Sequence, residues 1–99
     1  MSNVEEFIIM RQTLVIKVAG KVQGVFFRQS CREKAEALGI TGTVQNQSDG
    51  SVLITATGKE PVLSELIEWC KIGPPTAQVE ECAVFHAPIR DFERFEILR

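Results

Sequence analysis

The hydrophobic positions of this chain change their spacing several times, and each change marks a predicted element. Apolar residues alternate with polar ones over residues 13–19, as in a strand with one buried face. Over residues 27–38 they recur at helical spacing, and Gly39 stands where such a helix would end. The same reasoning predicts strands over residues 42–46, 51–57 and 79–86, a helix that begins at Pro61 and ends before Gly73, and a short extended segment over residues 91–98.

Three details of these elements can be predicted more closely. Asp49-Gly50 is a hairpin turn signal between the second and third strands, and Gly58 is expected to end the third strand. In the second helix the predicted buried stripe consists of Val62, Leu66, Trp69 and Cys70, widened by Leu63 and Ile67. The final extended segment has three apolar anchors, Phe92, Phe95 and Ile97.

The order strand, helix, strand, strand, helix, strand is that of a split βαβ unit repeated twice. It predicts an α+β protein with the ferredoxin-like sandwich fold. We expect an antiparallel four-stranded sheet with both helices on one face, plus a short C-terminal strand. A single domain would cover residues 13–99, after an N-terminal extension over residues 1–12 whose apolar centre, Phe7 to Met10, is expected to dock on the sheet.

Charge and composition exclude several classes of function. The 99 residues carry a formal net charge of −2, so the chain lacks the basic field that gathers nucleic acid or anionic lipid. The first ten residues contain two glutamates and no Lys or Arg, unlike a secretory signal, and the run Phe7 to Met10 is too short to span a bilayer. We therefore expect a cytoplasmic protein that binds neither nucleic acid nor membrane.

The three cysteines, Cys31, Cys70 and Cys82, form no C-x-x-C pair and have no metal-ligand spacing. Their odd number favours free thiols in a reducing compartment. Cys31 falls on the apolar stripe of the first helix, which favours core packing over a nucleophilic role. The lone histidine, His86, has no catalytic partner in a recognisable pattern, so we expect it to be a spectator.

The run from Gly20 to Arg28 carries the strongest chemical signal. Two glycines, Gly20 and Gly24, bracket a loop that leaves a strand and enters a helix whose first turn contains Arg28. This layout aims backbone N–H groups, a helix N-terminus and a guanidinium at one point, which is suited to an oxyanion such as phosphate. Arg28 alone would be unfavourable there by about 0.3–1 kcal/mol, because a cation meets the positive end of the helix dipole.

The predicted topology brings a second polar residue to the same place. The first and second strands run parallel with the third between them, so their carboxyl ends share one edge of the sheet. Asn46 ends the second strand and would therefore lie beside the loop, where ligands of such sheets tend to bind. Structural alternatives remain open: Arg28 as a solvated surface residue, Gly24 as a relief of a tight turn, and Asn46 as a turn cap.

The sequence resembles the acylphosphatase family over residues 13–99. The resemblance lies in Gly20-Lys21-Val22-Gln23-Gly24-Val25-Phe26-Phe27-Arg28, in Gly42-Thr43-Val44-Gln45-Asn46 with Asp49-Gly50, in Gly73-Pro74-Pro75-Thr76-Ala77-Gln78-Val79, and in the ending Phe95-Glu96-Ile97-Leu98-Arg99. One departure is visible, because the position of Thr43 more often holds an aromatic residue in this family.

The resemblance implies hydrolysis of the carboxyl–phosphate bond of acyl phosphates to carboxylate and inorganic phosphate. By the same resemblance Arg28 matches the phosphate-binding arginine and Asn46 the asparagine that orients the attacking water, and these are the catalytic residues. The loop residues Gln23, Gly24, Val25, Phe26 and Phe27 match the phosphate cradle. No metal or organic cofactor is implied, and a monomer is the simplest expectation.

Two rival functions fit parts of the pattern. A non-catalytic anion-binding or regulatory module is possible because the ferredoxin-like fold hosts many such domains. An RNA-binding module on the same sandwich would need aromatic and basic residues on the sheet face, which the predicted strands lack.

Overall fold

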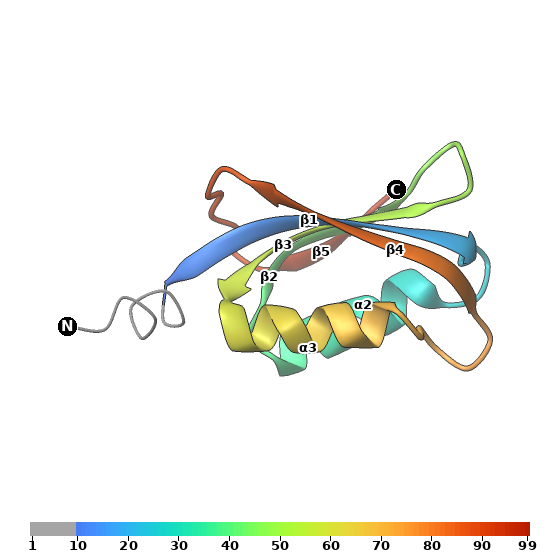
Figure 1. The fold of residues 1–99 in the computed structure, drawn as a ribbon, viewed down its shortest axis with the longest axis horizontal. Coiled ribbons are helices and arrows are strands. Elements are labelled where there is room, and N and C mark those ends of the chain that lie inside the picture. The colour runs from blue at the N-terminus through green and yellow to red at the C-terminus, as the bar shows by residue number, and fades with distance from the viewer. Residues whose placement is uncertain (1–9) are drawn as a thin grey trace.

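The computed structural model describes residues 10–99 and contains five strands and two helices. Both helices lie on one face of the sheet (Figure 1). The elements in chain order are β1 (Arg11–Lys21), α2 (Phe27–Ala37), β2 (Thr41–Asn46), β3 (Val52–Lys59), α3 (Glu60–Cys70), β4 (Gln78–Ala87) and β5 (Phe95–Leu98).

The sheet has the strand order β4-β1-β3-β2-β5, which confirms the predicted α+β ferredoxin-like fold. β3 is antiparallel to both β1 and β2, so β1 and β2 run parallel and their carboxyl ends share one edge. The short C-terminal strand β5 joins the sheet beside β2 and parallel to it. The sheet is therefore five-stranded and mixed, and β5 ends at the same edge as β2.

β1 to β4 are longer than the hydrophobic pattern predicts, whereas β5 is shorter than the extended segment predicted over residues 91–98. β1 starts at Arg11, opposite Lys59, so the last two residues of the predicted extension belong to the sheet. The prediction that Gly58 ends the third strand is wrong, because Gly58 lies opposite Gln12 and the ladder continues to Lys59. The rest of the extension, and with it the docking of residues 7–9, lies outside the described residues.

The core lies between the helices and the sheet. α2 buries Phe27, Cys31 and Ala35 as predicted. In α3 the fully buried residues are Leu63, Leu66 and Cys70, whereas Val62 and Trp69, predicted at the centre of the stripe, are half-buried. Apolar side chains cover much of this helix, so periodicity alone did not decide which of them face the sheet. Within the described residues no helix has both the length and the apolar character needed to cross a membrane.

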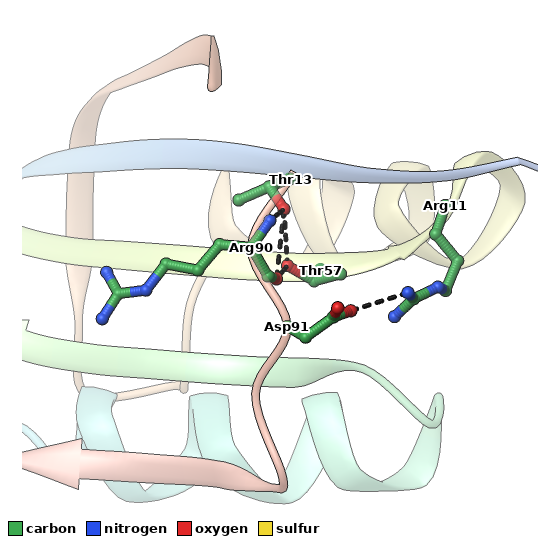
Figure 2. Close-up of polar contacts among 5 residues, drawn as sticks. All are labelled: Arg11, Thr13, Thr57, Arg90 and Asp91. Carbon is green, nitrogen blue, oxygen red and sulfur yellow. Dashed lines mark hydrogen bonds and ion pairs between the residues drawn. The ribbon is translucent and has the colours of Figure 1, made fainter. Parts of the chain in front are cut away.

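The segment between β4 and β5 crosses the sheet on the face opposite the helices, near the start of β1 (Figure 2). Thr57 donates a hydrogen bond of 2.6 Å from its hydroxyl to the carbonyl of Arg90. The backbone N–H of Arg90 donates to the hydroxyl of Thr13 at 2.9 Å, and the two hydroxyls are 2.7 Å apart. These bonds, which we call the threonine clasp, fix the connection that leads into β5, with an ion pair of 2.6 Å between Arg11 and Asp91 beside them.

Candidate active site

A cavity of about 290 Å³ opens where β1 and β2 end and α2 begins. The β1–α2 loop and the β2–β3 hairpin lie at this same end of the molecule (Figure 1). The cavity receives residues from the loop, from the first turn of α2, from the end of β2 and from β5. Its lining consists of Val22, Gly24, Phe26, Phe27, Arg28, Gln29, Asn46, Ile97 and Arg99.

The loop takes a backbone path that L-residues rarely adopt. Gly24 has φ 74°, and no atom lies within 4 Å of the place where its Cβ would be, so the need for glycine there is conformational. Phe26 also has a left-handed conformation, with φ 64° and ψ 22°, although it is not a glycine. Such a conformation costs on the order of 1–2 kcal/mol. The residue is 72% exposed, so side-chain burial does not offset this cost.

Backbone strain of this kind turns consecutive amide groups toward one side of the chain and forms an anion-binding concavity. Within residues 10–99 no backbone carbonyl accepts a hydrogen bond from the N–H groups of residues 23–27. The first N–H to donate along α2 is that of Ser30, to the carbonyl of Phe26. The loop and the first turn of the helix therefore offer a set of free donors.

Arg28 lies in the first turn of α2, half-buried and lining the cavity. Its guanidinium forms none of the ion pairs found among the described residues, and the first turn of the helix contains no acidic residue. A cation at the positive end of a helix, without a carboxylate beside it, is electrostatically unfavourable. A bound dianion would remove this penalty.

Asn46, the last residue of β2, lines the same cavity. Its side-chain oxygen Oδ1 is buried and receives no hydrogen bond from any described group. An unpartnered buried acceptor costs about 1–3 kcal/mol, and such groups are rare in folded proteins. The acceptor therefore has room for one donor that the protein itself does not supply, such as a water molecule.

The electrostatics of the cavity differ from those of the whole chain. Its lining contains Arg28 and Arg99 and no Asp or Glu, although the net charge of the protein is −2. Sequence reasoning missed Arg99 and Ile97 because it did not place β5 beside β2. Leu98 pairs with Gln45, so Arg99 follows next to Asn46. The C-terminal motif Phe95-Glu96-Ile97-Leu98-Arg99 was the available signal, but a sequence motif does not show where its residues lie in the fold.

Gln23 and Val25, which were also predicted to form the phosphate cradle, do not line the cavity as Gly24, Phe26 and Phe27 do. The Gln23 side chain turns toward the β2–β3 hairpin and donates to two of its carbonyls, at 2.8 and 2.9 Å. Val25 is buried in the core, and its carbonyl accepts a hydrogen bond of 2.7 Å from the hydroxyl of Thr76. Neither side chain lines the cavity, so a role of these residues in anion binding is limited to their backbone amides.

The other reactive side chains lie away from this cavity. Cys31 and Cys70 are buried free thiols, and a hydrogen bond from the Cys70 thiol to Cys31, together with burial, raises the pKa of Cys70 well above its usual value. Cys31 is thus a core residue, as predicted. His86 is exposed and belongs to a different cavity, between β4 and α3.

Comparison with known proteins agrees with this geometry. The sequence model of the acylphosphatase family matches residues 14–97. The chain is 46% identical over 82 residues to an acylphosphatase of Acaryochloris marina, covering 83% of this chain and 88% of that protein. It is 51% identical over 75 residues to an acylphosphatase of Shewanella amazonensis, covering 76% and 81% of the two chains. The structure of an acylphosphatase from Coxiella burnetii superimposes with a TM-score of 0.87 at 38% identity, over 99% of this chain and 100% of that one.

The fold and the cavity together define a ferredoxin-like α+β protein with a cavity where β1 and β2 end, lined by groups suited to an oxyanion. The chain belongs to the acylphosphatase family. The resemblance read from the sequence and the predicted enzyme class, a hydrolase, are thereby confirmed.

Proposed function

We propose that this cavity hydrolyses the carboxyl–phosphate bond of acyl phosphates by direct attack of a water molecule. The observation that carries the proposal is the oxygen of Asn46, which has no partner among residues 10–99, in a cavity that also holds the guanidinium of Arg28, which forms no ion pair with those residues. One group suits a water molecule and the other suits a phosphoryl group. The family to which the chain belongs supports the same chemistry.

The phosphoryl group would be held by Arg28 and by the free amides of the loop and of the first turn of α2. Each charge-assisted hydrogen bond of this kind contributes roughly 1.5–3 kcal/mol. The donors face the oxygens on which charge develops during phosphoryl transfer, and they are fixed before the substrate arrives. The left-handed conformation of Phe26 turns the neighbouring amides toward one side of the chain.

The attacking water would donate a hydrogen bond to Oδ1 of Asn46. Its oxygen forms a bond to phosphorus while the bond between phosphorus and the carboxylate oxygen breaks. The carboxylate leaves with the electron pair of that bond and needs no proton, and the proton of the water passes to a phosphoryl oxygen. No general base is needed, because positioning and charge stabilisation account for the reaction.

A non-catalytic anion-binding module is the competing function. It would use Arg28 and the loop amides equally well. Such a module would not need Oδ1 of Asn46, however. A carbonyl oxygen repels the oxygens of a phosphate dianion and is suited to a donor such as water. The acceptor beside the anion site therefore favours hydrolysis over simple binding.

The test is release of phosphate from benzoyl phosphate, with p-nitrophenyl phosphate as the control substrate. We expect turnover of benzoyl phosphate with competitive inhibition by inorganic phosphate. We expect no turnover of p-nitrophenyl phosphate, whose phenolate is a poorer leaving group than a carboxylate. Competitive binding of inorganic phosphate without turnover of benzoyl phosphate would establish the non-catalytic module instead.

A further inference from the structure

We infer that Gln23 is a positioning residue that holds the phosphate-binding loop against the hairpin that carries Asn46, and this inference rests on the proposed function. Its amide nitrogen Nε2 donates one hydrogen bond of 2.8 Å to the carbonyl of Gln47 and one of 2.9 Å to the carbonyl of Ser51. A side-chain amide has two N–H donors, and both are used here. We call this pair of bonds the glutamine bridge.

The glutamine bridge joins the two halves of the site directly. Gln23 is adjacent to Gly24, which lines the cavity, and Gln47 is adjacent to Asn46. The loop follows β1 and the hairpin joins β2 to β3. β3 pairs directly with β1 and lies between β1 and β2, so the sheet ladders connect β2, which carries Asn46, to β1 and its loop only through β3. The bridge therefore sets the distance between the bound phosphoryl group and the water held by Asn46.

The hairpin does not need the bridge in order to form. The carbonyl of Ser51 already accepts a hydrogen bond of 2.8 Å from the N–H of Gln47, and the carbonyl of Gln47 accepts one of 3.1 Å from the N–H of Gly50. Gln23 thus donates to the second lone pair of each carbonyl. Removing its amide leaves the turn closed, so the variant is expected to fold.

The consequence of losing the bridge is predicted to be catalytic. Water and phosphorus must be aligned for in-line attack, and a misplacement of about 1 Å can cost roughly a hundredfold in rate. Phosphate binding depends on Arg28 and the loop amides and is expected to change little. Gln23 itself touches neither the water nor the substrate, because its side chain does not line the cavity.

The experiment uses Gln23→Met, which keeps the length of the side chain and removes both donors. We expect kcat for benzoyl phosphate to fall about tenfold to a hundredfold. We expect the inhibition constant for inorganic phosphate to change by less than about threefold. Lys17→Met is the matched control, because Lys17 ties the same hairpin to β1 through an ion pair of 2.9 Å with Asp49 and does not touch the loop; its kcat should stay within about twofold of wild type.

A double-mutant cycle separates positioning from a general loss of structure. If Gln23 acts by placing Asn46, then Gln23→Met in an Asn46→Ala background should lower kcat by less than about twofold further. Equal losses in the two backgrounds, a wild-type kcat in Gln23→Met, or a parallel loss of phosphate affinity would each overturn the inference. Absence of turnover in the wild-type protein would instead refute the proposed function, so the two failures are distinguishable. Thermal unfolding of each variant confirms that the proteins compared are folded.

Discussion

The two ends of the sheet differ in their polar groups, although among the described residues each has one buried side-chain atom without a partner, Gln12 Nε2 where β1 begins and Asn46 Oδ1 where β1 finishes. At the end where β1 begins, the threonine clasp satisfies both hydroxyls and both backbone groups of Arg90, and Arg11 is paired with Asp91 (Figure 2). At the end where β1 finishes, Phe26 is strained and Oδ1 of Asn46 has no partner among the described groups. Natural proteins keep such unfavourable features where function requires them, so we expect the threonine clasp to serve stability and the cavity end, where the backbone is strained, to serve the proposed chemistry.

The comparison predicts that mutations at the two ends affect different measurements. Substitutions at the cavity end should lower activity and leave stability unchanged or slightly higher. Substitutions at the threonine clasp should lower stability and leave activity nearly unchanged.

Arg28→Ala should have the largest effect on activity. We expect a loss of at least about a hundredfold in kcat/KM for benzoyl phosphate, together with weaker inhibition by phosphate, because a charged donor to the phosphoryl oxygens is removed. Stability should rise by about 0.3–1 kcal/mol in urea unfolding, because a cation leaves the positive end of α2. Wild-type turnover in this variant would show that Arg28 is not part of the site.

Asn46→Ala should lower kcat by up to about a hundredfold, because the attacking water loses the group that orients it. Inhibition by inorganic phosphate should stay close to wild type, since the phosphate contacts do not include Asn46. The unpartnered oxygen is also removed, so urea unfolding should show no loss of stability. A fall in phosphate affinity equal to the fall in kcat would show that Asn46 builds the phosphate site instead.

Thr57→Val tests the other end of the sheet. The substitution keeps the β-branched shape and removes the hydroxyl that bonds to Arg90 and Thr13, so we expect a loss of about 1–3 kcal/mol in urea unfolding. Turnover of benzoyl phosphate at 25 °C should stay within about twofold of wild type. The control is Thr55→Val on the same strand, which is half-buried and lies outside the clasp; its stability should change by less than about 0.5 kcal/mol.

Lowering the pH should remove the contribution of the Asp49 carboxylate, in the β2–β3 hairpin, to the stability of the folded protein. The hydroxyl of Ser51 donates to Asp49 at 2.6 Å, and this bond and the ammonium of Lys17 hold the pKa of that carboxyl well below its usual value of 3.8. A carboxyl with a lowered pKa contributes stability that is present above the unfolded value and lost as pH falls through the folded value. The difference in urea midpoint between wild type and Asp49→Asn should therefore shrink as pH falls below about 4; a constant difference between pH 7 and pH 3 would contradict this assignment.

Part of the site could be predicted from local sequence alone. The Gly20 to Arg28 run indicated a strand, a glycine-containing loop and a helix with an arginine in its first turn, and the structure has each of them. Asn46 could be placed because the element order fixes β1 and β2 as parallel neighbours of β3. The strain at Phe26 could not be predicted, since phenylalanine has no preference for a left-handed conformation.

Other parts depend on contacts between distant segments. Hydrophobic spacing indicated an extended segment near the C-terminus but did not identify its neighbour, so Ile97 and Arg99 were not placed in the cavity. Gln23 was assigned to the phosphate cradle because it lies in the loop motif, whereas its side chain reaches carbonyls 24 and 28 residues away in the sequence. A side chain with three rotatable bonds can take many directions, and only its packed surroundings select one.

The sequence by itself determined the elements, their order and the chemistry available at the loop, because propensity, periodicity and glycine placement act over a few residues. Tertiary structure decided how that chemistry is arranged: β5 lies beside β2, Gln23 turns to the hairpin, and the acceptor on Asn46 has no partner in the part of the chain that the structure describes. These arrangements arise only when segments far apart in the chain come into contact. Hydrogen bonds and burial between such segments are properties of the folded chain as a whole, and no local pattern records them.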